Sequence, residues 1–394
     1  MERLRRWIIN IVVCALLSIT TEGVGVGITY LESAVAKGAV CLDGTAPAFH
    51  WDKGSGSGIN NWMVLIEGGG WCQDIANCID RKGCDRGSST LMRKEFGFSG
   101  ILGPQNRTNP DFSNWNRVKV RYCDGASFTG DVEAVDPINR LHFRGARIWH
   151  AVMDELLEKG MKNAENAILT GCSAGGLATI LHCDDFRDHL PSTTKVKCVA
   201  DAGYFIHGKD ISGGSYVESF YKQVVSLHGS VKNLPQSCTS RTNPPELCFF
   251  PQYVIPHMHT PIFIISAAYD SWQIKNILAP GPADKLRAWD TCKFDFRTCS
   301  QNQMNVIQSF RYQVLNALKP VMDNKQHGLF LDSCYAHCQA GGEDTWMLDN
   351  SPIIDNTTIA KAVGDWFYER NYYNKVDNCG YPCNPTCPDL NEAD

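Results

Sequence analysis

One short segment, AILTGCSAGGLAT at residues 167–179, constrains the fold of this chain most strongly. Its apolar start could close a strand, and Leu177, Ile180 and Leu181 have the spacing of a helix that packs on a sheet. The glycines at 171 and 175 flank position 173 symmetrically. A chain that reverses sharply between strand and helix needs small residues at these two places. The segment therefore predicts a strand, a tight turn and a helix, with Ser173 at the tip.

Two adjacent nucleophiles, Cys172 and Ser173, compete for the tip of this turn. The pattern glycine, any residue, serine, any residue, glycine places the serine where its side chain stands exposed above the sheet. The next backbone N–H, that of Ala174, would then begin a helix and could donate to a developing oxyanion. We therefore predict that Ser173 is the nucleophile and that Cys172 points behind the turn into packing.

Further apolar runs surround this segment and alternate with helical patterns. Continuous β-rich runs occur at 62–66, 118–122, 197–200, 261–267 and 328–331, whereas 143–159 has helical spacing. Such alternation predicts an α/β fold with a mostly parallel central sheet flanked by helices, similar to an α/β hydrolase. We expect a single domain over residues 24–394, with an insertion rich in Cys and Pro around 213–258.

A glycine-rich loop follows the first of these strands, as an oxyanion hole would require. Gly69 and Gly70 precede Trp71, and glycine lets a backbone N–H approach a substrate carbonyl oxygen. An isolated glycine triplet is more often an ordinary turn. Together with the turn at Ser173, it predicts that the N–H groups of Gly69, Gly70 and Ala174 form the oxyanion hole.

A serine nucleophile needs a base, and the base needs an orienting carboxylate. Asp270 ends the strand at 261–267 and follows the serine in the order serine, aspartate, histidine, whereas the alternative Asp201 comes one strand earlier. His337 lies in the loop beyond 328–331, and His327 precedes that strand and is less well placed. The sequence thus predicts Ser173, Asp270 and His337 as the catalytic residues.

Other residues of the same loops are candidates for the pocket. Trp71, Asp124 and Trp272 could contact substrate, although structural packing is an equally good interpretation for each. No paired spacing of metal ligands accompanies them, so we expect neither a metal nor an organic cofactor.

The N-terminal residues 1–23 have the layout of a secretory signal, with three arginines before an apolar run that is short for a membrane span. A transmembrane anchor is the alternative. Secretion gives meaning to the sequons at Asn106 and Asn356, which we expect to carry glycans at the surface. A net charge of −5 argues against a nucleic-acid partner, which would require a basic face.

The chain has 18 cysteines, one of them inside the expected leader. In a secreted protein such density predicts disulfides, and the spacings at Cys72 to Cys84 and Cys379 to Cys387 do not match those of structural zinc. The mature chain would hold an odd number of cysteines, so at least one thiol must be free. We expect Cys172, packed under the turn, to be that thiol.

Several longer motifs make the chain resemble the plant pectin acetylesterases, a group that shares a broader family with the secreted carboxylesterase Notum. These motifs are LIEGGGWC (65–72), RYCDGASFTGD (121–131), FRGARIW (143–149), GCSAGG (171–176), DAGYF (201–205), AAYDSWQIKN (267–276) and AHCQ (336–339). The resemblance implies an α/β-hydrolase fold, the same three catalytic residues and oxyanion donors, and the removal of acetyl groups from pectin.

The expected protein is a secreted, monomeric serine esterase of the cell wall that acts on acetylated pectin or a related polysaccharide through an acetyl-serine intermediate. It would have no nucleic-acid partner and no stable membrane anchor. Two alternatives remain open at this point. One is a deacylase of longer acyl esters or lipidated protein, as in Notum, and the other is a wall-binding protein without catalysis.

Overall fold

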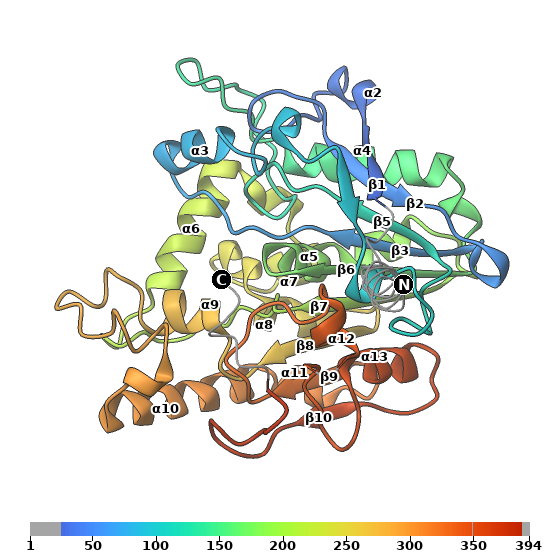
Figure 1. Cartoon of the computed structure of the whole chain (residues 1–394). Coiled ribbons are helices and arrows are strands. Elements are labelled where there is room, and N and C mark those ends of the chain that lie inside the picture. The colour runs from blue at the N-terminus through green and yellow to red at the C-terminus, as the bar shows by residue number, and fades with distance from the viewer. Residues whose placement is uncertain (1–24, 349, 388–394) are drawn as a thin grey trace, which may run out of the picture.

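A ten-stranded sheet forms the centre of the protein, in the order β10-β9-β8-β7-β6-β3-β5-β2-β1-β4 (Figure 1). The computed structural model describes residues 25–348 and 350–387, so the expected leader at 1–23 lies outside the described residues. The strands are β1 (Gly25–Tyr30), β2 (Ala48–Asp52), β3 (Asn61–Ile66), β4 (Glu95–Gly97), β5 (Asn116–Val120), β6 (Asn166–Cys172), β7 (Lys195–Asp201), β8 (Ile262–Ala267), β9 (Gly328–Asp332) and β10 (Asn374–Val376).

Most of the sheet is parallel. Every neighbouring pair from β10 across to β5 is parallel, and β2, β1 and β4 add an antiparallel edge. The predicted α/β class is therefore confirmed. The antiparallel edge was not expected from the sequence, because β4 has only three residues, β1 and β4 contain glycine, and β2 has no continuous apolar run.

Helices cover both faces of this sheet. The helices are α2 (Glu32–Val35), α3 (Ile75–Lys82), α4 (Gly145–Glu158), α5 (Ala174–Asp188), α6 (Tyr216–His228), α7 (Gln236–Thr239), α8 (Pro251–Val254), α9 (Ser271–Gln273), α10 (Gln301–Ala317), α11 (Lys319–Asp323), α12 (Glu343–Trp346) and α13 (Ile359–Phe367). Successive side chains of a strand point to opposite faces. Val64 and Leu169 accordingly pack in the core that includes α4 and α5, and Met63 and Ile168 pack in the core that includes α13.

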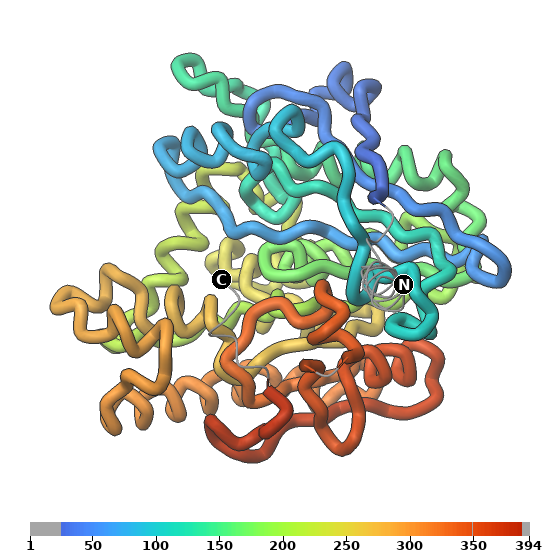
Figure 2. The backbone as a smooth tube through the Cα atoms, in the orientation of Figure 1, coloured from blue at the N-terminus to red at the C-terminus, as the bar shows by residue number. Residues whose placement is uncertain are grey.

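The segment between β7 and β8 holds α6, α7 and α8, and within it Cys238 is bonded to Cys248. It covers the proline-rich stretch that the sequence marks at 213–258. Figure 2 shows the later loop from α9 to α10, in orange, at the left edge of the molecule. Across the ranges that the structure describes, no helix has both the length and the apolar character to cross a bilayer.

The register of the parallel strands determines where the site forms. Cys172 at the end of β6 pairs with Asp201 at the end of β7, which pairs in turn with Ile265 of β8. Ala267 at the end of β8 pairs with Asp332 at the end of β9. The carboxyl ends of four adjacent strands therefore meet at one edge, and the loops that carry the predicted catalytic residues leave from it.

Candidate active site

Ser173 is the single residue that connects β6, which ends at Cys172, to α5, which begins at Ala174. Its φ of 59° and ψ of −127° are strained for a residue with a side chain, as the tip of a sharp strand-to-helix turn requires. A Cβ placed on Gly175 would lie 2.1 Å from the backbone oxygen of Ile66, which explains why only glycine fits there. The turn predicted from the sequence is therefore present, with Ser173 at its tip.

His337 and Asp270 form a short polar contact between the loops that follow β8 and β9. The Nδ1 atom of His337 lies 2.7 Å from Oδ2 of Asp270, whose side chain is only 1% exposed. An ionised carboxylate can only accept hydrogen bonds, so Nδ1 carries the proton and Nε2 is left as an acceptor. Burial alone would lower the pKa of His337, but the charge and hydrogen bond of Asp270, together with the charge of Asp201, raise that pKa above its ordinary value.

Asp270 is fixed in place by a second contact. Its Oδ1 accepts from the backbone N–H of Gln273 at 2.9 Å, so the same carboxylate caps the short helix α9. The structure thus brings together the acid and base that the sequence predicts. Both come from loops at the carboxyl edge of the sheet, beyond β8 and β9.

Asp201, the alternative acid, has a different set of partners. Its Oδ2 accepts from the backbone N–H groups of Gln339 and Ala340, at 2.8 and 2.7 Å, just after His337. Burial raises the pKa of Asp201 to about 6. This carboxylate therefore holds the loop that carries His337 and does not contact the imidazole through a hydrogen bond.

The prediction that Cys172 is the free thiol is wrong. Cys172 is bonded to Cys338, and the free cysteine of the described residues is the exposed Cys84. Residues 166 positions apart in the sequence must meet in space for this pairing, and no local pattern shows such a meeting. The prediction that these cysteines form disulfides and not zinc sites is confirmed. Cys72 pairs with Cys78, Cys379 with Cys383, and Cys387 with Cys334.

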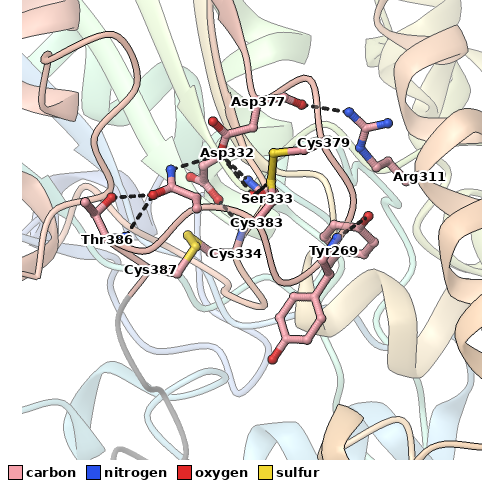
Figure 3. Close-up of a disulfide and its surroundings, with 12 residues drawn as sticks. Tyr269, Arg311, Asp332, Ser333, Cys334, Asp377, Cys379, Cys383, Thr386 and Cys387 are labelled. Atoms are coloured by element: carbon pink, nitrogen blue, oxygen red, sulfur yellow. Dashed lines mark hydrogen bonds between the residues drawn. A yellow bond between two sulfur atoms is a disulfide. The ribbon is translucent and has the colours of Figure 1, made fainter.

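The C-terminal segment anchors the start of the loop that carries His337 (Figure 3). The backbone N–H of Ser333 donates to Oδ2 of Asp377 at 2.9 Å, and Arg311 donates to the backbone oxygen of Asp377 at 2.7 Å. Cys334, the next residue of the loop, is bonded to Cys387. Together with the Cys172–Cys338 bond, these contacts hold the loop on both sides of His337.

The glycine loop after β3 has its carbonyl groups turned into the protein. Arg86 donates to the oxygen of Gly68 at 3.1 Å, Arg81 to that of Gly69 at 2.8 Å, and Tyr122 to that of Gly70 at 2.8 Å. Both Gly69 and Gly70 have positive φ, which favours glycine. Among the described residues, no acceptor is found for the N–H groups of Gly69, Gly70 or Ala174, as expected of donors kept for a ligand.

A Cβ on Gly68 would lie 3.0 Å from the Cβ of Ser173, so the glycine loop lies directly against the turn. Ser173 and His337 line one pocket of about 560 Å³ together with Gly68 and Gly69. The predicted nucleophile, base and oxyanion loop therefore share a single cavity. This is an arrangement suited to acyl transfer.

Two of the three proposed pocket residues belong to an aromatic cluster next to this cavity. The ring of Trp71 packs edge to face on those of Phe205 and Trp272, at 5.1 and 5.5 Å between centroids, and Phe205 lies 6.3 Å from His337. Asp124 is placed elsewhere. It is fully buried and accepts from the backbone N–H groups of Ala126 and Phe128, so it supports a loop and does not line the cavity.

Sequence reasoning missed Ser127, which links Trp71 to the helix of the turn. The indole N–H of Trp71 donates to Oγ of Ser127 at 2.7 Å, and this Oγ donates to the backbone oxygen of Ala174 at 2.8 Å. Arg81 and Arg86 were missed as well. Both arginines donate to backbone carbonyl oxygens and lie in none of the family motifs. Ser127 lies in the motif at 121–131, which was the only sequence signal for these three residues.

The sequons lie away from the cavity, and Asn106 and Asn356 are both exposed. Three groups of side chains in the described ranges have metal-ligand geometry, but two of them use cysteines that are already in disulfides. The third, His150 with Asp185 and His189, is at the surface of α4 and α5 and away from the pocket of Ser173.

The sheet order, the strained turn and the paired imidazole and carboxylate define a protein of the α/β-hydrolase class. The sequence model of the pectinacetylesterase family matches residues 19–388, and the chain belongs to this family. Pectin acetylesterase 7 of Arabidopsis thaliana is 62% identical over the full length of both chains. Pectin acetylesterase 11 of the same plant is 64% identical over 94% of each chain.

A solved structure agrees with this placement. The Wnt deacylase Notum from Drosophila superimposes with a TM-score of 0.77 at 26% identity, over 92% of this chain and 99% of that one. The predicted resemblance to the pectin acetylesterases and the α/β-hydrolase-like fold are thus both confirmed.

Proposed function

We propose that the protein is a secreted serine esterase that removes acetyl groups from pectin, with Ser173, His337 and Asp270 as its catalytic residues. The observation that carries the proposal is the 2.7 Å contact between His337 and Asp270, beside a strained Ser173 in the same pocket. The family and its plant relatives supply the substrate class, since both curated relatives are named pectin acetylesterases.

In the proposed mechanism, Nε2 of neutral His337 takes the proton of Ser173 as Oγ attacks the acetyl carbonyl carbon. Asp270 keeps Nδ1 protonated and stabilises the imidazolium. The N–H groups of Gly69, Gly70 and Ala174 stabilise the tetrahedral oxyanion, and one such donor is typically worth about 3 kcal/mol. His337 then protonates the departing sugar oxygen, which leaves as a hydroxyl, and a water molecule releases acetate from the acetyl-serine by the same relay.

The character of the cavity supports a short acyl group on a polar substrate. Charged side chains line much of the pocket that contains Ser173, and the rings of Trp71, Phe205 and Trp272 fill the neighbouring space. An acetyl group needs little apolar volume. A polysaccharide chain suits a polar, open cavity.

A deacylase of longer acyl esters is the second candidate, because a second, partly apolar pocket borders the aromatic cluster at Phe220 and Trp272. This pocket of about 210 Å³ is lined by Val217, Phe220 and Trp272 among others, but neither Ser173 nor His337 lines it. The solved relative is named a Wnt deacylase. A series of nitrophenyl esters decides between the candidates, since a preference for octanoate over acetate would contradict the acetylesterase.

The direct test measures acetate release from acetylated pectin and acetylated xylan by the wild type and by Ser173→Ala. We expect release from pectin, little from xylan, and a loss of about 10⁶-fold in kcat in the variant. A wild type that binds pectin but releases no acetate would instead indicate a wall-binding protein. Residual activity of Ser173→Ala close to that of the wild type would refute the assigned nucleophile.

The remaining parts of the proposal concern the processing, domain organisation, glycosylation and location of the protein. We propose that residues 1–23 are a cleaved secretory leader and that 24–394 form one monomeric esterase domain, with 213–258 as its insertion. The exposed Asn106 and Asn356 are the proposed glycosylation sites, and the extracellular space or cell wall is the proposed location. Mass spectrometry of protein secreted from plant cells would test the new N-terminus and both glycans.

A further inference from the structure

The pocket that contains Ser173 is unusually basic for an acidic protein. The chain carries a net charge of −5, yet basic side chains outnumber acidic ones in the lining of this pocket. The basic residues are Arg86, Arg93, Lys119 and Arg121, and the acidic residues are Glu67 and Asp85. A local excess of one charge around a cleft attracts ligands of the opposite charge.

Two of these cations already form ion pairs inside the protein. Nε of the buried Arg121 donates to Glu67 at 2.8 Å, and Nζ of Lys119 lies 3.6 Å from the same carboxylate. Burial would raise the pKa of Glu67, but Lys119 and Arg121 together lower it, so Glu67 is ionised. Nη2 of Arg121 also donates to Asp85 at 3.3 Å, so Lys119 and Arg121 are already paired with the carboxylates of Glu67 and Asp85.

Arg86 and Arg93 keep unused hydrogen-bonding capacity. Arg86 donates from Nη1 to the oxygen of Gly68, and its buried Nε lies 3.7 Å from Asp85, which leaves Nη2 without a hydrogen bond within the described part of the chain. Arg93 is exposed and forms no hydrogen bond or ion pair within residues 25–348 and 350–387. Two guanidinium groups with free donors therefore face the same cavity as the nucleophile.

We infer that Arg86 and Arg93 form a carboxylate subsite that binds free galacturonate carboxylates next to the acetylated sugar. The inference rests on the proposed function and extends it to the ionic form of the substrate. Guanidinium groups bind carboxylates through paired, charge-assisted hydrogen bonds, and a methyl ester removes both the charge and one acceptor oxygen. The enzyme therefore prefers acetylated galacturonan with free carboxylates over the methyl-esterified polymer.

Arg93 gives the cleaner test, because Arg86 also supports the oxyanion loop through Gly68. The experiment measures kcat/KM of the wild type on acetylated galacturonan and on the same polymer after methyl esterification. We expect the wild type to prefer the free acid, and Arg93→Gln to reduce that preference about tenfold, with Arg93→Lys in between. Raising the ionic strength about tenfold should weaken the preference of the wild type as well.

Arg241→Gln is the matched control, since it removes the same charge from an exposed arginine that does not line this pocket. It should keep the preference of the wild type, and thermal midpoints of both variants show whether folding is intact. An Arg93→Gln variant with the wild-type preference would overturn the inference. Equal rates of the wild type on the two polymers would overturn it as well, while leaving the proposed function standing.

A binding measurement separates this inference from the proposed function. Calorimetry with Ser173→Ala and short oligogalacturonates, without acetyl groups, should show tighter binding of the free acid than of its methyl ester. If the wild type releases no acetate but this difference persists, the proposed function fails and the subsite stands. If acetate is released but the two oligomers bind equally, the subsite fails.

Discussion

Cys172, the residue before Ser173, is bonded to Cys338, the residue after His337. The two Cα atoms lie 5.7 Å apart, although 166 residues separate them in the sequence. This bond joins the turn that carries the proposed nucleophile to the loop that carries the proposed base. The relative position of Ser173 and His337 therefore depends on a covalent link as well as on packing.

The first prediction concerns this bond. A double substitution, Cys172→Ala with Cys338→Ala, removes it without leaving a reactive thiol. We expect the free energy of unfolding to fall by about 2–5 kcal/mol, because the unfolded chain gains freedom, and kcat to fall more than KM rises. Urea denaturation and acetate release measure the two effects. Cys84→Ser, at the exposed free cysteine, is the control and should change stability by no more than about 0.5 kcal/mol.

The second prediction separates the two carboxylates near His337. Asp270→Asn removes the negative charge that stabilises the imidazolium, and its amide N–H can hold the imidazole in the wrong tautomer, so kcat should fall by about 10⁴. Asp201→Asn keeps an oxygen for the N–H groups of Gln339 and Ala340, and we expect a much smaller loss. If Asp201→Asn were the more damaging variant, the assignment of the acid would have to be reversed.

The pH dependence of kcat/KM gives a second test of how the carboxylates of Asp270 and Asp201 act on His337. Only neutral His337 can accept the serine proton, so activity falls as the pH drops through its pKa. Asp270, and to a smaller extent Asp201, raise that pKa. Removing either charge should shift the acidic limb of kcat/KM to lower pH. Profiles of Asp201→Asn and the wild type check this, because the variant keeps enough activity to measure.

The third prediction concerns Asp332, whose buried carboxyl group lies at the end of β9. Burial raises the pKa of Asp332 from 3.8 to about 7, although hydrogen bonds from the Cys334 N–H and the Gln339 side chain partly oppose this shift. The protonated group stabilises the fold fully below the unfolded value of 3.8, and this contribution is lost as the pH rises through about 7.

The thermal midpoint of the wild type, taken relative to that of Asp332→Asn, should therefore fall by a few degrees between about pH 5 and about pH 8. Asp188→Asn, at the exposed end of α5, is the control and should parallel the wild type at every pH. A parallel course of Asp332→Asn would refute the assignment.

Much of the site could be predicted because its chemistry has a sequence signature. The glycines around Ser173 and the order of Asp270 and His337 follow from the geometry of a turn and of a parallel sheet. The buried strands β3, β6, β8 and β9 contain continuous apolar runs, and β7 contains a shorter one between charged residues, so each strand could be located from the sequence close to its observed bounds.

The parts that were missed depend on contacts between distant segments. The partner of Cys172 is set by where the loop after β9 folds back, and parity alone selected the wrong free cysteine. Arg86 supports the glycine loop by donating to a carbonyl oxygen, a role that any arginine at the right point in space could fill. Such residues carry no motif, so only the folded structure reveals them.

The last prediction concerns Ser127, whose hydroxyl group joins two parts of the oxyanion region. It accepts from the indole of Trp71 and donates to the oxygen of Ala174, so Ser127→Ala leaves the buried indole N–H unpaired and removes one hydrogen bond from the Ala174 oxygen, which keeps its bond within α5. We expect a loss of about 1–3 kcal/mol in the free energy of unfolding, and a drop in kcat with little change in KM, since the Ala174 N–H acts on the transition state.

Ser309→Ala removes a serine hydroxyl from the exposed surface of α10 and serves as the control, with stability unchanged or slightly increased. Denaturation curves and initial rates of acetate release on both variants are sufficient. A Ser127→Ala enzyme that is destabilised but keeps the kcat of the wild type would show that the hydroxyl supports only the fold. A lowered kcat at unchanged KM would show that the same hydroxyl positions the oxyanion donor.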